Sequence, residues 1–577
     1  MLWRLCEGKA DLLNDFKILN TKIKLRIGLL VDSNVLEAWA LRMLEIIRDS
    51  EYAEIVLVVR NVPIRANNAG GSYTKYSMAR LAHAAIDRML SFAERLVLGR
   101  RSELPDAFAV ADASAIWNGA EILLVSPRKS TFSDYIVEHD LQKIREKNLD
   151  VLIRLGFRVL RGGILQAARY GVWSLHHGDN RINRGGPPGY WEVVESAPEI
   201  GSVLQILTED LDNGRVIYRS FSTTDSMSLY RTRNRLYWKS LQFIPRRLKD
   251  LHSLDADAFF RMIEQPTTAL QFYDRRLYRG PRAPVRVAML AKKVWQKLRR
   301  RYDEWRFIDQ WTIKYAFSDD ISTVLWRFKS LLPPMDRIWA DPFVVGHAEK
   351  HYIFFEEMLF AEHKAHIAVM EISRDGPIGS PTKVLVTPHH LSYPFIFEYE
   401  GAYFMVPESA RNRTLDLYKC VRFPDQWVFQ KHIIQDCAVA DATLFEWKGK
   451  WWMFANMAEI EAALRTDELC LFYADNPLST EWQAHPRNPI VSDVKSARSA
   501  GRLFIRNGRI FRPSQNCSPR YGYGFNICEI VKLTETEYEE RVISRVEPKW
   551  QDDVLATHTF NYADGLTVID AQIRRKR

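Results

Sequence analysis

Two polar segments in the N-terminal half carry side chains that could perform proton-transfer chemistry. His176 ends a short apolar run at 172–176, and a Gly/Pro-rich loop follows at 178–189. Asp212 comes 36 residues later, in a predicted tight turn before a strand. A histidine and a carboxylate together can orient an amine, accept its proton and stabilise a tetrahedral intermediate. The pair predicts a catalytic role, whereas His176 taken alone would as readily be structural.

The segments around this pair alternate between strands and helices. Strand–helix–strand order requires crossover connections and predicts a parallel sheet, whose ligands bind beyond the carboxyl ends of the strands. As the last residue of its strand, His176 is expected to face such a site. The predicted strands are 22–31, 54–59, 122–125, 151–155 and 172–176, and the predicted helices are 34–49 and 138–147.

These motifs resemble the folate-dependent formyltransferases, which include methionyl-tRNA formyltransferase, glycinamide ribonucleotide transformylase and the sugar N-formyltransferases. The family signature is Asn-x-His at a strand end, an Arg-Gly-Gly/Ala-x-Pro loop and then Leu-Asp-x-Gly. The counterparts here are Ser174-Leu-His176, Arg184 to Pro188, and Leu211 to Gly214. The resemblance covers about residues 22–225 and implies a Rossmann-like α/β domain with a parallel sheet.

The resemblance also implies the catalytic roles. His176 would assist proton transfer from the attacking amine, and Asp212 would orient and charge-stabilise that histidine. Ser174 stands where the family has an Asn whose amide donates to the oxyanion, and losing one such donor costs about 100- to 1,000-fold in rate. Three alternatives stay open: a slower or altered transferase, a site that uses Asn180, Asn183 or His177 as the donor, or a domain that only binds.

The formyl donor implied by the resemblance is 10-formyltetrahydrofolate. Its pterin is expected between the loop before the His176 strand and the segment before Asp212, although these apolar residues could equally be plain core. Arg184 is expected to bind the acceptor. No metal is expected, since no metal-ligand spacing occurs. The expected folate-binding residues are Phe157, Arg158, Val159, Leu160, Leu207 and Asp210.

From about residue 335 the sequence becomes all-β and repeats. Each repeat is a strand, a tight turn and a second strand, and most of the turns carry a glycine. The turn glycines Gly401, Gly449, Gly508 and Gly565 are separated by 48, 59 and 57 residues. Five hairpins at this period predict a five-bladed β-propeller, with a periodic β-sandwich as the alternative.

The repeat starts resemble the blades of five-bladed glycosidases that act on arabinans and xylans, and most closely the propeller of plant glucosamine inositolphosphorylceramide transferases. By this resemblance Asp341 matches the catalytic base and Asp441 the residue that tunes pKa. The acid Glu is missing, since the fourth repeat opens with Arg498-Ser-Ala-Gly501. Hydrolysis by the two-carboxylate mechanism is therefore not expected, and Asp341 and Asp441 are predicted to bind sugar hydroxyls or, alternatively, only to form turns. Three carboxylates could replace the acid: Glu356, Glu357 and Glu408.

A basic, helical stretch joins the two regions. Between Arg275 and Arg306 there are 12 Lys/Arg residues against two acids, and 285–302 predicts an amphipathic helix. The alternatives are a solvated helix face, attachment to an anionic membrane surface, and nucleic acid, of which the last is not expected.

The whole chain has 577 residues, a net charge of +10 and six cysteines without a CxxC pair. This predicts a folded cytoplasmic protein, with peripheral attachment at the inner membrane surface as an alternative, and domains at 22–225, 226–330 and 331–577. The predicted function is N-formyl transfer to a nucleotide- or lipid-linked amino sugar in surface-glycan synthesis, with the propeller binding carbohydrate. The alternatives are an inactive glycan-binding scaffold and a glycoside-processing propeller.

Overall fold

The computed structural model describes residues 22–62, 88–97, 99, 104–210, 213–263, 273–458 and 464–577. The chain divides into two compact units. We call residues 9–220 and 224–296 the α/β unit, and residues 297–577, which group with 221–223, the β unit. No helix among the described residues is long and apolar enough to cross a membrane.

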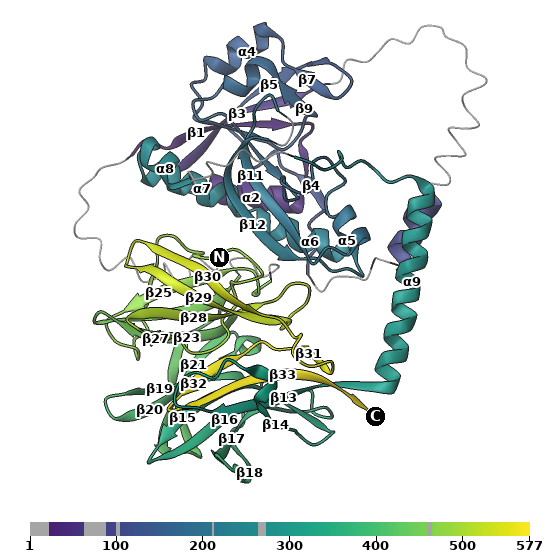
Figure 1. The fold of residues 1–577 in the computed structure, drawn as a ribbon. Coiled ribbons are helices and arrows are strands. Elements are labelled where there is room, and N and C mark those ends of the chain that lie inside the picture. Colours follow the sequence, from purple (N-terminus) through teal and green to yellow (C-terminus); the bar gives the residue numbers. More distant parts are fainter. Residues whose placement is uncertain are drawn as a thin grey trace. The chain divides into compact units, whose positions relative to one another are not determined.

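A seven-stranded sheet organises the α/β unit, in the order β12-β11-β10-β8-β1-β3-β5 (Figure 1). The five strands from β10 to β5 are parallel, as predicted, whereas β11 runs antiparallel to β10. The inner parallel strands are rich in buried Val, Ile and Leu because both faces of the sheet are covered there, whereas the edge strand β5 exposes Ile122 and Leu124. Their bounds are β1 Leu25–Val31, β3 Ala53–Asn61, β5 Glu121–Val125, β8 Val151–Arg154, β10 Val172–His176, β11 Glu199–Ile206 and β12 Arg215–Thr223.

Shorter elements and helices surround this sheet. Both helices predicted between the strands are present, as α2 Ala38–Arg48 and α4 Glu138–Arg145. Further elements before the last strand of the sheet are β2 Val35–Glu37, β4 Val110–Asp112, β6 Arg128–Lys129, β7 Ser133–Tyr135, β9 Val159–Arg161, the 3₁₀ helix η2 Gly162–Gln166 and α5 Tyr190–Glu195, and residues 88–97 are also helical.

The stretch predicted to be a helical connector is helical only in part. Its helices are α6 Leu229–Ser240, α7 Phe243–Ser253, α8 Ala256–Ile263 and the long α9 Ala283–Arg306. From Phe307 the chain becomes β13, Phe307–Phe317, followed by η3 Leu325–Arg327 and β14 Lys329–Leu331. The helical expectation fails there because β13 is stabilised by a partner strand that lies far away in sequence.

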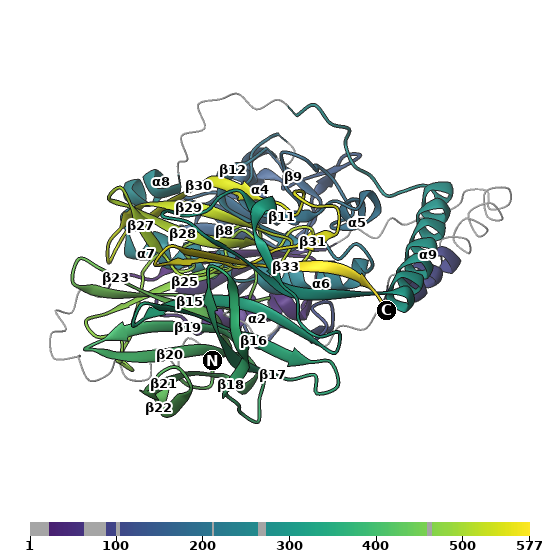
Figure 2. The same cartoon turned by 60° about the horizontal axis from the view of Figure 1, so that its bottom comes forward.

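Five antiparallel sheets make up the β unit, one for each predicted repeat (Figures 1 and 2). Four of them are simple meanders of four consecutive strands. Their strands are β15 Arg337–His347, β16 Lys350–Leu359, β17 Ala365–Ser373, β18 Gly376–Leu385; β19 Ser392–Tyr399, β20 Ala402–Ser409, β21 Thr414–Arg422, β22 Gln426–Ile434; β23 Val439–Trp447, β24 Lys450–Met457, β25 Leu469–Ala474, β26 Gln483–Ala484; and β27 Phe504–Arg506, β28 Arg509–Asn516, β29 Gly524–Leu533, β30 Tyr538–Val546. The 3₁₀ helix η4, Ala410–Asn412, follows β20.

The fifth sheet joins the beginning of the β unit to its end. β13 pairs with β33, Leu566–Lys576, along eleven residues from Phe307–Lys576 to Phe317–Leu566, and the two strands run side by side in both views (Figures 1 and 2). β14, β31 Val554–Ala556 and β32 Phe560–Ala563 complete this sheet. The sheet is therefore closed by segments from opposite ends of the unit.

The glycine turns confirm the predicted hairpins. Gly449 has φ of 75° and the preceding Lys448 has φ of 52°, and the turns at Gly401, Gly508 and Gly565 share this left-handed pair. Two successive positive φ angles define the type I′ turn that matches the twist of a two-residue hairpin. The first repeat makes the same turn with Ala348 and Glu349, at φ of 49° and 62°, although neither residue is a glycine.

Candidate functional site

A polar pocket lies within the β unit, with a volume of about 280 Å³. Its lining comes from several different sheets, so that only the folded unit brings these side chains together. The lining residues are Trp311, Ile338, Ala340, Asp341, Glu356, His390, Ser392, Glu408, Ala410, Arg411, Arg465, Arg498, Tyr521 and His558.

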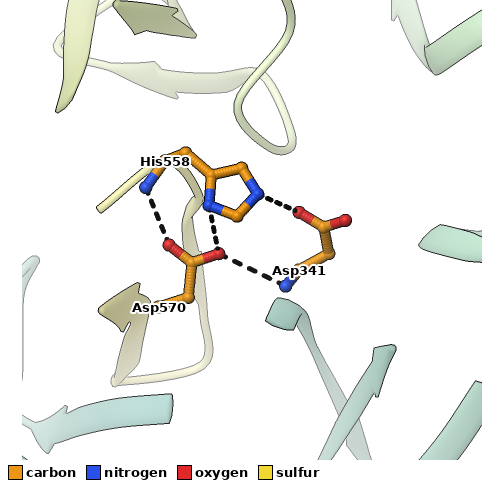
Figure 3. Close-up of side chains that lie close together, drawn as sticks. All are labelled: Asp341, His558 and Asp570. Atoms are coloured by element: carbon orange, nitrogen blue, oxygen red, sulfur yellow. Dashed lines mark hydrogen bonds and ion pairs between the residues drawn. The ribbon is translucent and has the colours of Figure 1, made fainter. Parts of the chain in front are cut away.

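Three residues at the pocket form what we call the histidine cluster: Asp341, His558 and Asp570 (Figure 3). The imidazole of His558 lies between the two carboxylates, with Nε2 3.1 Å from Asp341 and Nδ1 2.8 Å from Asp570. Burial alone would lower the pKa of His558, but the charges of Asp570 and Asp341 outweigh it and raise the pKa well above its usual value. The cluster is therefore a buried imidazolium held by two carboxylates.

Hydrogen bonds from residues 558 and 559 hold both carboxylates of the histidine cluster. Asp570 Oδ1 accepts hydrogen bonds from the backbone N–H groups of His558 at 2.8 Å and Thr559 at 3.0 Å. Asp341 Oδ1 accepts from the Thr559 hydroxyl at 2.8 Å. Burial opposes ionisation of Asp341, but His558 and these hydrogen bonds lower its pKa overall. Asp341 is thus the ionised carboxylate at the pocket surface.

Asp341 and Asp441 occupy the same kind of β-bulge, in which the residue has a positive φ angle. Asp341, Tyr393 and Asp441 have φ of 50°, 44° and 49°, and each lies at a register shift between the first two strands of its sheet. Such bulges bend the strand and re-aim a side chain, and the positive φ carries a strain that functional sites often store. The predicted turn-forming role therefore applies to the backbone of these two aspartates. Their side chains form ion pairs, Asp341 with His558 and Asp441 with Arg498.

The histidine cluster also contains the ligand types of a metal site, although the sequence predicted none. Its potential ligand atoms lie within 4.8 Å of one another. The two carboxylates, however, occupy opposite ring nitrogens of His558. One ion bound to a single nitrogen could not replace both contacts, so this geometry suits a doubly protonated imidazole better than a metal.

A second group of charges, which we call the arginine cluster, comprises Asp441, Arg498 and Glu408. Arg498 Nε lies 2.6 Å from Asp441, and its Nη2 lies 3.2 Å from Glu408. Asp441 also accepts from Gln515 at 3.2 Å and is 1% exposed, and it is not among the pocket-lining residues. Burial and the repulsion of Glu408 raise the pKa of Asp441 against the attraction of Arg498. Arg498, at the position where the glycosidase resemblance requires an acid, therefore ties two carboxylates together.

The three glutamates considered as replacement acids differ in position. Glu356 and Glu408 line the pocket. Glu357 instead accepts hydrogen bonds from Trp339 at 2.9 Å and His366 at 3.0 Å. Burial raises its pKa, but these bonds and one from Arg337 lower it to about 2.

Glu356 is the pocket carboxyl most disposed to keep its proton. Burial and the neighbouring Asp341 charge raise its pKa well above its usual value. The imidazolium of His558 opposes this rise. His390 lies 3.4 Å away, and burial lowers its own pKa. A protonated Glu356 and an ionised Asp341 in one pocket are a potential acid and base.

Aromatic rings and guanidinium groups complete the lining. Trp311 packs against the His558 ring with centroids 4.3 Å apart, and Arg498 lies over the Tyr521 ring at 4.9 Å. Arg411 and Arg465 have no carboxylate within ion-pair distance in the described parts of the chain. Arg498 and His558 are each engaged by two carboxylates, so Arg411 and Arg465 are the lining guanidinium groups left available to an anionic ligand.

In the α/β unit, His176 ends β10 as predicted. Its Nε2 lies 2.9 Å from the carbonyl oxygen of Asn183, so the Gly/Pro-rich loop folds back over the strand end. Asp212 and Leu211 lie outside the described residues, and the predicted pairing of His176 with Asp212 stays a prediction.

Ser174 is only 2% exposed, and its hydroxyl accepts a hydrogen bond from Arg154 Nη1 at 3.2 Å. Arg154 ends the adjacent strand β8 and also donates to the carbonyls of Phe157 and Arg158. No role was predicted for Arg154, although an arginine at the end of a buried apolar strand was a usable signal. Arg154 places a permanent cation beside Ser174, the residue that stands where the formyltransferase family has an Asn.

The three alternative donors have other partners. His177 stacks on Tyr237 at 3.7 Å and bonds to Ser240, and burial with the nearby cations lowers its pKa to about 3. Asn183 donates its amide to Glu192 at 2.9 Å. Asn180 accepts from Arg219 at 2.9 Å.

The residues expected to bind folate divide into core and surface. Phe157 and Leu160 are 6% and 2% exposed and belong to the hydrophobic core, with Leu207 packed against it. Val159 is half-buried in β9, and Asp210 is exposed.

Arg158 and Arg184, which were given binding roles, are held by protein groups. Arg158 pairs with the buried Asp134 at 2.7 Å. Arg184 stacks over Tyr273 at 4.5 Å and donates to Asn213, the neighbour of Asp212, at 3.0 Å.

Residues 333–557 match a family model described as "Glucosamine inositolphosphorylceramide transferase 1, N-terminal". The rice (Oryza sativa subsp. japonica) protein "Glucosamine inositolphosphorylceramide transferase 1" is 36% identical over 204 residues, which cover 35% of this chain and 27% of that protein. The Arabidopsis thaliana protein of the same name is 32% identical over 204 residues, 35% of this chain and 26% of its own length. The match thus spans about a quarter of these relatives, whose names describe them as transferases.

Solved structures give weaker likenesses. A family 117 glycoside hydrolase of Zobellia galactanivorans, Zg3597, is 12% identical with a TM-score of 0.30, over 45% of this chain and 90% of that one. Glycinamide ribonucleotide transformylase 1 of Symbiobacterium toebii is 13% identical with a TM-score of 0.25, over 38% and 84%.

Proposed function

We propose that this chain is a sugar-modifying transferase of glycan synthesis, and that its five β sheets are the blades of a propeller whose pocket binds the sugar. The observation that carries the proposal is the pocket itself. It combines carboxylates, an imidazolium and arginines with the rings of Trp311 and Tyr521. Sugars present many hydroxyls and a weakly apolar ring face, and they bind best to such mixed polar and aromatic surfaces. The likeness of residues 333–557 to named glycolipid transferases supports the same substrate class.

The sugar would carry a phosphate. Arg411 and Arg465 supply two uncompensated guanidinium groups at the pocket, and arginine forms strong charge-assisted hydrogen bonds with phosphate oxygens. A nucleotide-linked or lipid-linked sugar meets this requirement.

Calorimetric titration with glucosamine and with glucosamine 1-phosphate tests sugar binding. We expect glucosamine 1-phosphate to bind about tenfold more tightly, because ionised partners strengthen hydrogen bonds. Arg411→Gln/Arg465→Gln should remove that difference and keep the weaker glucosamine binding. An Arg374→Gln/Arg509→Gln variant, altered at exposed arginines outside the pocket lining, is the matched control. Absence of binding by either sugar would contradict the carbohydrate role.

For the reaction, we propose N-formyl transfer from 10-formyltetrahydrofolate to the amino group of the sugar by the α/β unit. The amine nitrogen would bond to the formyl carbon while the bond from that carbon to folate N10 breaks. His176 would receive the amine proton and return it to the leaving nitrogen. The proposal is supported by the position of His176 at the carboxyl end of β10 in a largely parallel sheet.

Arg154 would replace the missing Asn as the group that stabilises the oxyanion. Its guanidinium already contacts Ser174, at the position of that Asn. A fixed cation stabilises developing negative charge at least as well as a neutral amide. Ser174→Asn is consequently not expected to raise turnover, since the larger side chain must displace Arg154.

The reaction is tested by mass spectrometry of glucosamine 1-phosphate incubated with 10-formyltetrahydrofolate and the protein. We expect the sugar to gain one formyl group, His176→Ala to abolish the gain, and Arg154→Gln to slow it about 100-fold. His139→Ala, at an exposed histidine of α4, is the control. If the wild type neither formylates nor binds 5-formyltetrahydrofolate in a titration, the inactive-scaffold alternative is supported. Phe157→Ala is a poor probe of folate binding because it removes a core side chain.

Glycoside processing at the pocket is the second candidate, favoured by one observation. Asp341 has a lowered pKa while Glu356, in the same pocket, has a raised one. Glu356 could protonate a leaving glycosidic oxygen while Asp341 accepts a proton from the attacking water. Release of nitrophenol from nitrophenyl glycosides by the wild type, lost in Glu356→Gln, would support this function. No release from any tested glycoside would exclude it for those substrates.

A further inference from the structure

Among the described residues, helix α9 packs one side against the α/β unit. Arg286 forms an ion pair with Glu94 at 2.8 Å, Met289 packs with Tyr190 and Trp191, and Lys293 is 0% exposed. These three residues recur at positions i, i+3 and i+7, which places them on one face of the helix.

A different face of α9 is apolar and exposed. The side chains that form it are between 43% and 73% exposed, although they include two tryptophans. With 3.6 residues per turn, they occupy a continuous stripe of about one-third of the helix circumference, away from the buried face. We call them the apolar stripe: Val287, Val294, Trp295, Leu298, Tyr302 and Trp305.

Cations border the apolar stripe on both sides. Lys292 and Arg299 lie along one edge of the stripe, and Arg301 lies along the opposite edge. All three side chains are exposed. Arg300, further round, is engaged by Glu304 at 2.7 Å. An ordinary solvated helix would place polar residues where the stripe lies.

We propose that α9 lies on the surface of an anionic phospholipid membrane, with the apolar stripe in the boundary between headgroups and acyl chains. Charge complementarity favours an anionic membrane as the surface that α9 contacts. An apolar face bordered by Lys and Arg, with Trp among the inserted side chains, has the composition of helices that bind the membrane interface. The bordering cations would contact lipid phosphates and carboxylates, each strengthening binding several-fold.

Flotation of the full chain with vesicles tests the proposal. We expect binding to vesicles of phosphatidylcholine mixed with phosphatidylserine, much weaker binding to phosphatidylcholine alone, and weakening by salt. Trp295→Gln/Trp305→Gln should lower the bound fraction about tenfold or more. Trp326→Gln, at another exposed tryptophan (61%), should bind as the wild type does.

The contribution of the bordering cations to membrane binding is tested with a second variant and its control. Arg299→Gln/Arg301→Gln should lower binding to the mixed vesicles by about tenfold. Lys383→Gln/Arg545→Gln, which removes two charges from exposed strand positions, should not. Gln is a good helix former, so α9 should persist, and far-UV circular dichroism checks this.

Three results would overturn the proposal. The first is flotation that is absent, or equal for the wild type and Trp295→Gln/Trp305→Gln. The second is a wild-type dimer in light scattering that this variant converts to a monomer, which would assign the stripe to a second copy of the chain. The third is salt-sensitive binding to RNA or DNA without binding to vesicles. Sugar binding and formyl transfer are measured without lipid, so their failure is separate from this one.

Discussion

The histidine cluster and the arginine cluster of the β unit have the same plan but different cations. Each places one cation between two carboxylates, and each uses an aspartate at a strained bulge, Asp341 or Asp441. The histidine can lose its proton, whereas the arginine cannot. The comparison teaches that one cluster can respond to pH through its cation and the other only through its carboxylates.

The largest effect is expected from Asp570→Ala. It removes a fully buried carboxylate that pairs with His558 and accepts three backbone hydrogen bonds, from residues 341, 558 and 559. Breaking a buried pair by removing one partner costs about 3–5 kcal/mol of unfolding free energy. Urea unfolding measures the loss. The control is Asp309→Ala, which breaks the exposed pair with Arg574 and should cost less than about 1 kcal/mol.

Arg498→Gln should be the next most costly change, by about 3 kcal/mol, because it leaves Asp441 and Glu408 without their cation. Without the attraction of Arg498 the already raised pKa of Asp441 would rise further in the folded protein, so its ionisation would destabilise the fold. The loss should therefore be small near pH 5 and grow towards pH 8. A loss that is independent of pH would show that the arginine acts through packing alone.

His558→Gln should show the opposite dependence on pH. The pKa of His558 is raised in the folded protein, so its stabilisation is complete below the ordinary histidine pKa and declines as pH rises towards the folded value. The difference in unfolding free energy between wild type and His558→Gln should thus be larger at pH 6 than at pH 9, by at least about 1 kcal/mol. Parallel pH trends for the His558 and Arg498 variants would remove the distinction between the clusters.

The smallest effect is the expected difference in stability between replacing Asp341 and replacing Asp441. Asp341→Asn and Asp441→Asn keep a side chain that tolerates positive φ, so only the charge changes. The pKa of Asp341 is lowered and that of Asp441 raised. Asp341→Asn should consequently cost more stability at neutral pH, by about 1 kcal/mol. Equal costs in thermal unfolding would mean that both aspartates carry the same charge.

Local patterns in the sequence predicted much of this fold. Apolar runs identified the five parallel strands of the α/β sheet but not β11, and the turn glycines identified the hairpins because a type I′ turn needs positive φ. The same patterns could not find β13, since its partner β33 lies at the far end of the unit. Pairing between such distant segments leaves no periodic signal in either of them.

The candidate site was predictable only where a local signal stood out. His176 was found at the end of a predicted strand, and Asp341 by the resemblance of its repeat start to glycosidase blades. Arg154, at the end of β8, could have been found as His176 was. Asp570 was missed because it continues the apolar run of β33, where nothing local shows that a carboxylate will meet His558. The excess charge at Arg411 and Arg465 depends on which arginines find partners, and a linear sequence does not contain that information.

The pairing of β13 with β33 also sets the order in which the β unit can be completed during synthesis. When β13 leaves the ribosome, its partner has not yet been made, and four other sheets must be translated first. Until then the nascent chain exposes a free strand edge, the kind of surface that pairs wrongly with other chains. Asp570 and His558 also arrive with this last segment. If translation stops early, the released chain therefore lacks β33, and its pocket is incomplete. The exposed edge of β13 is then a feature by which the cell's quality control recognises the truncated chain.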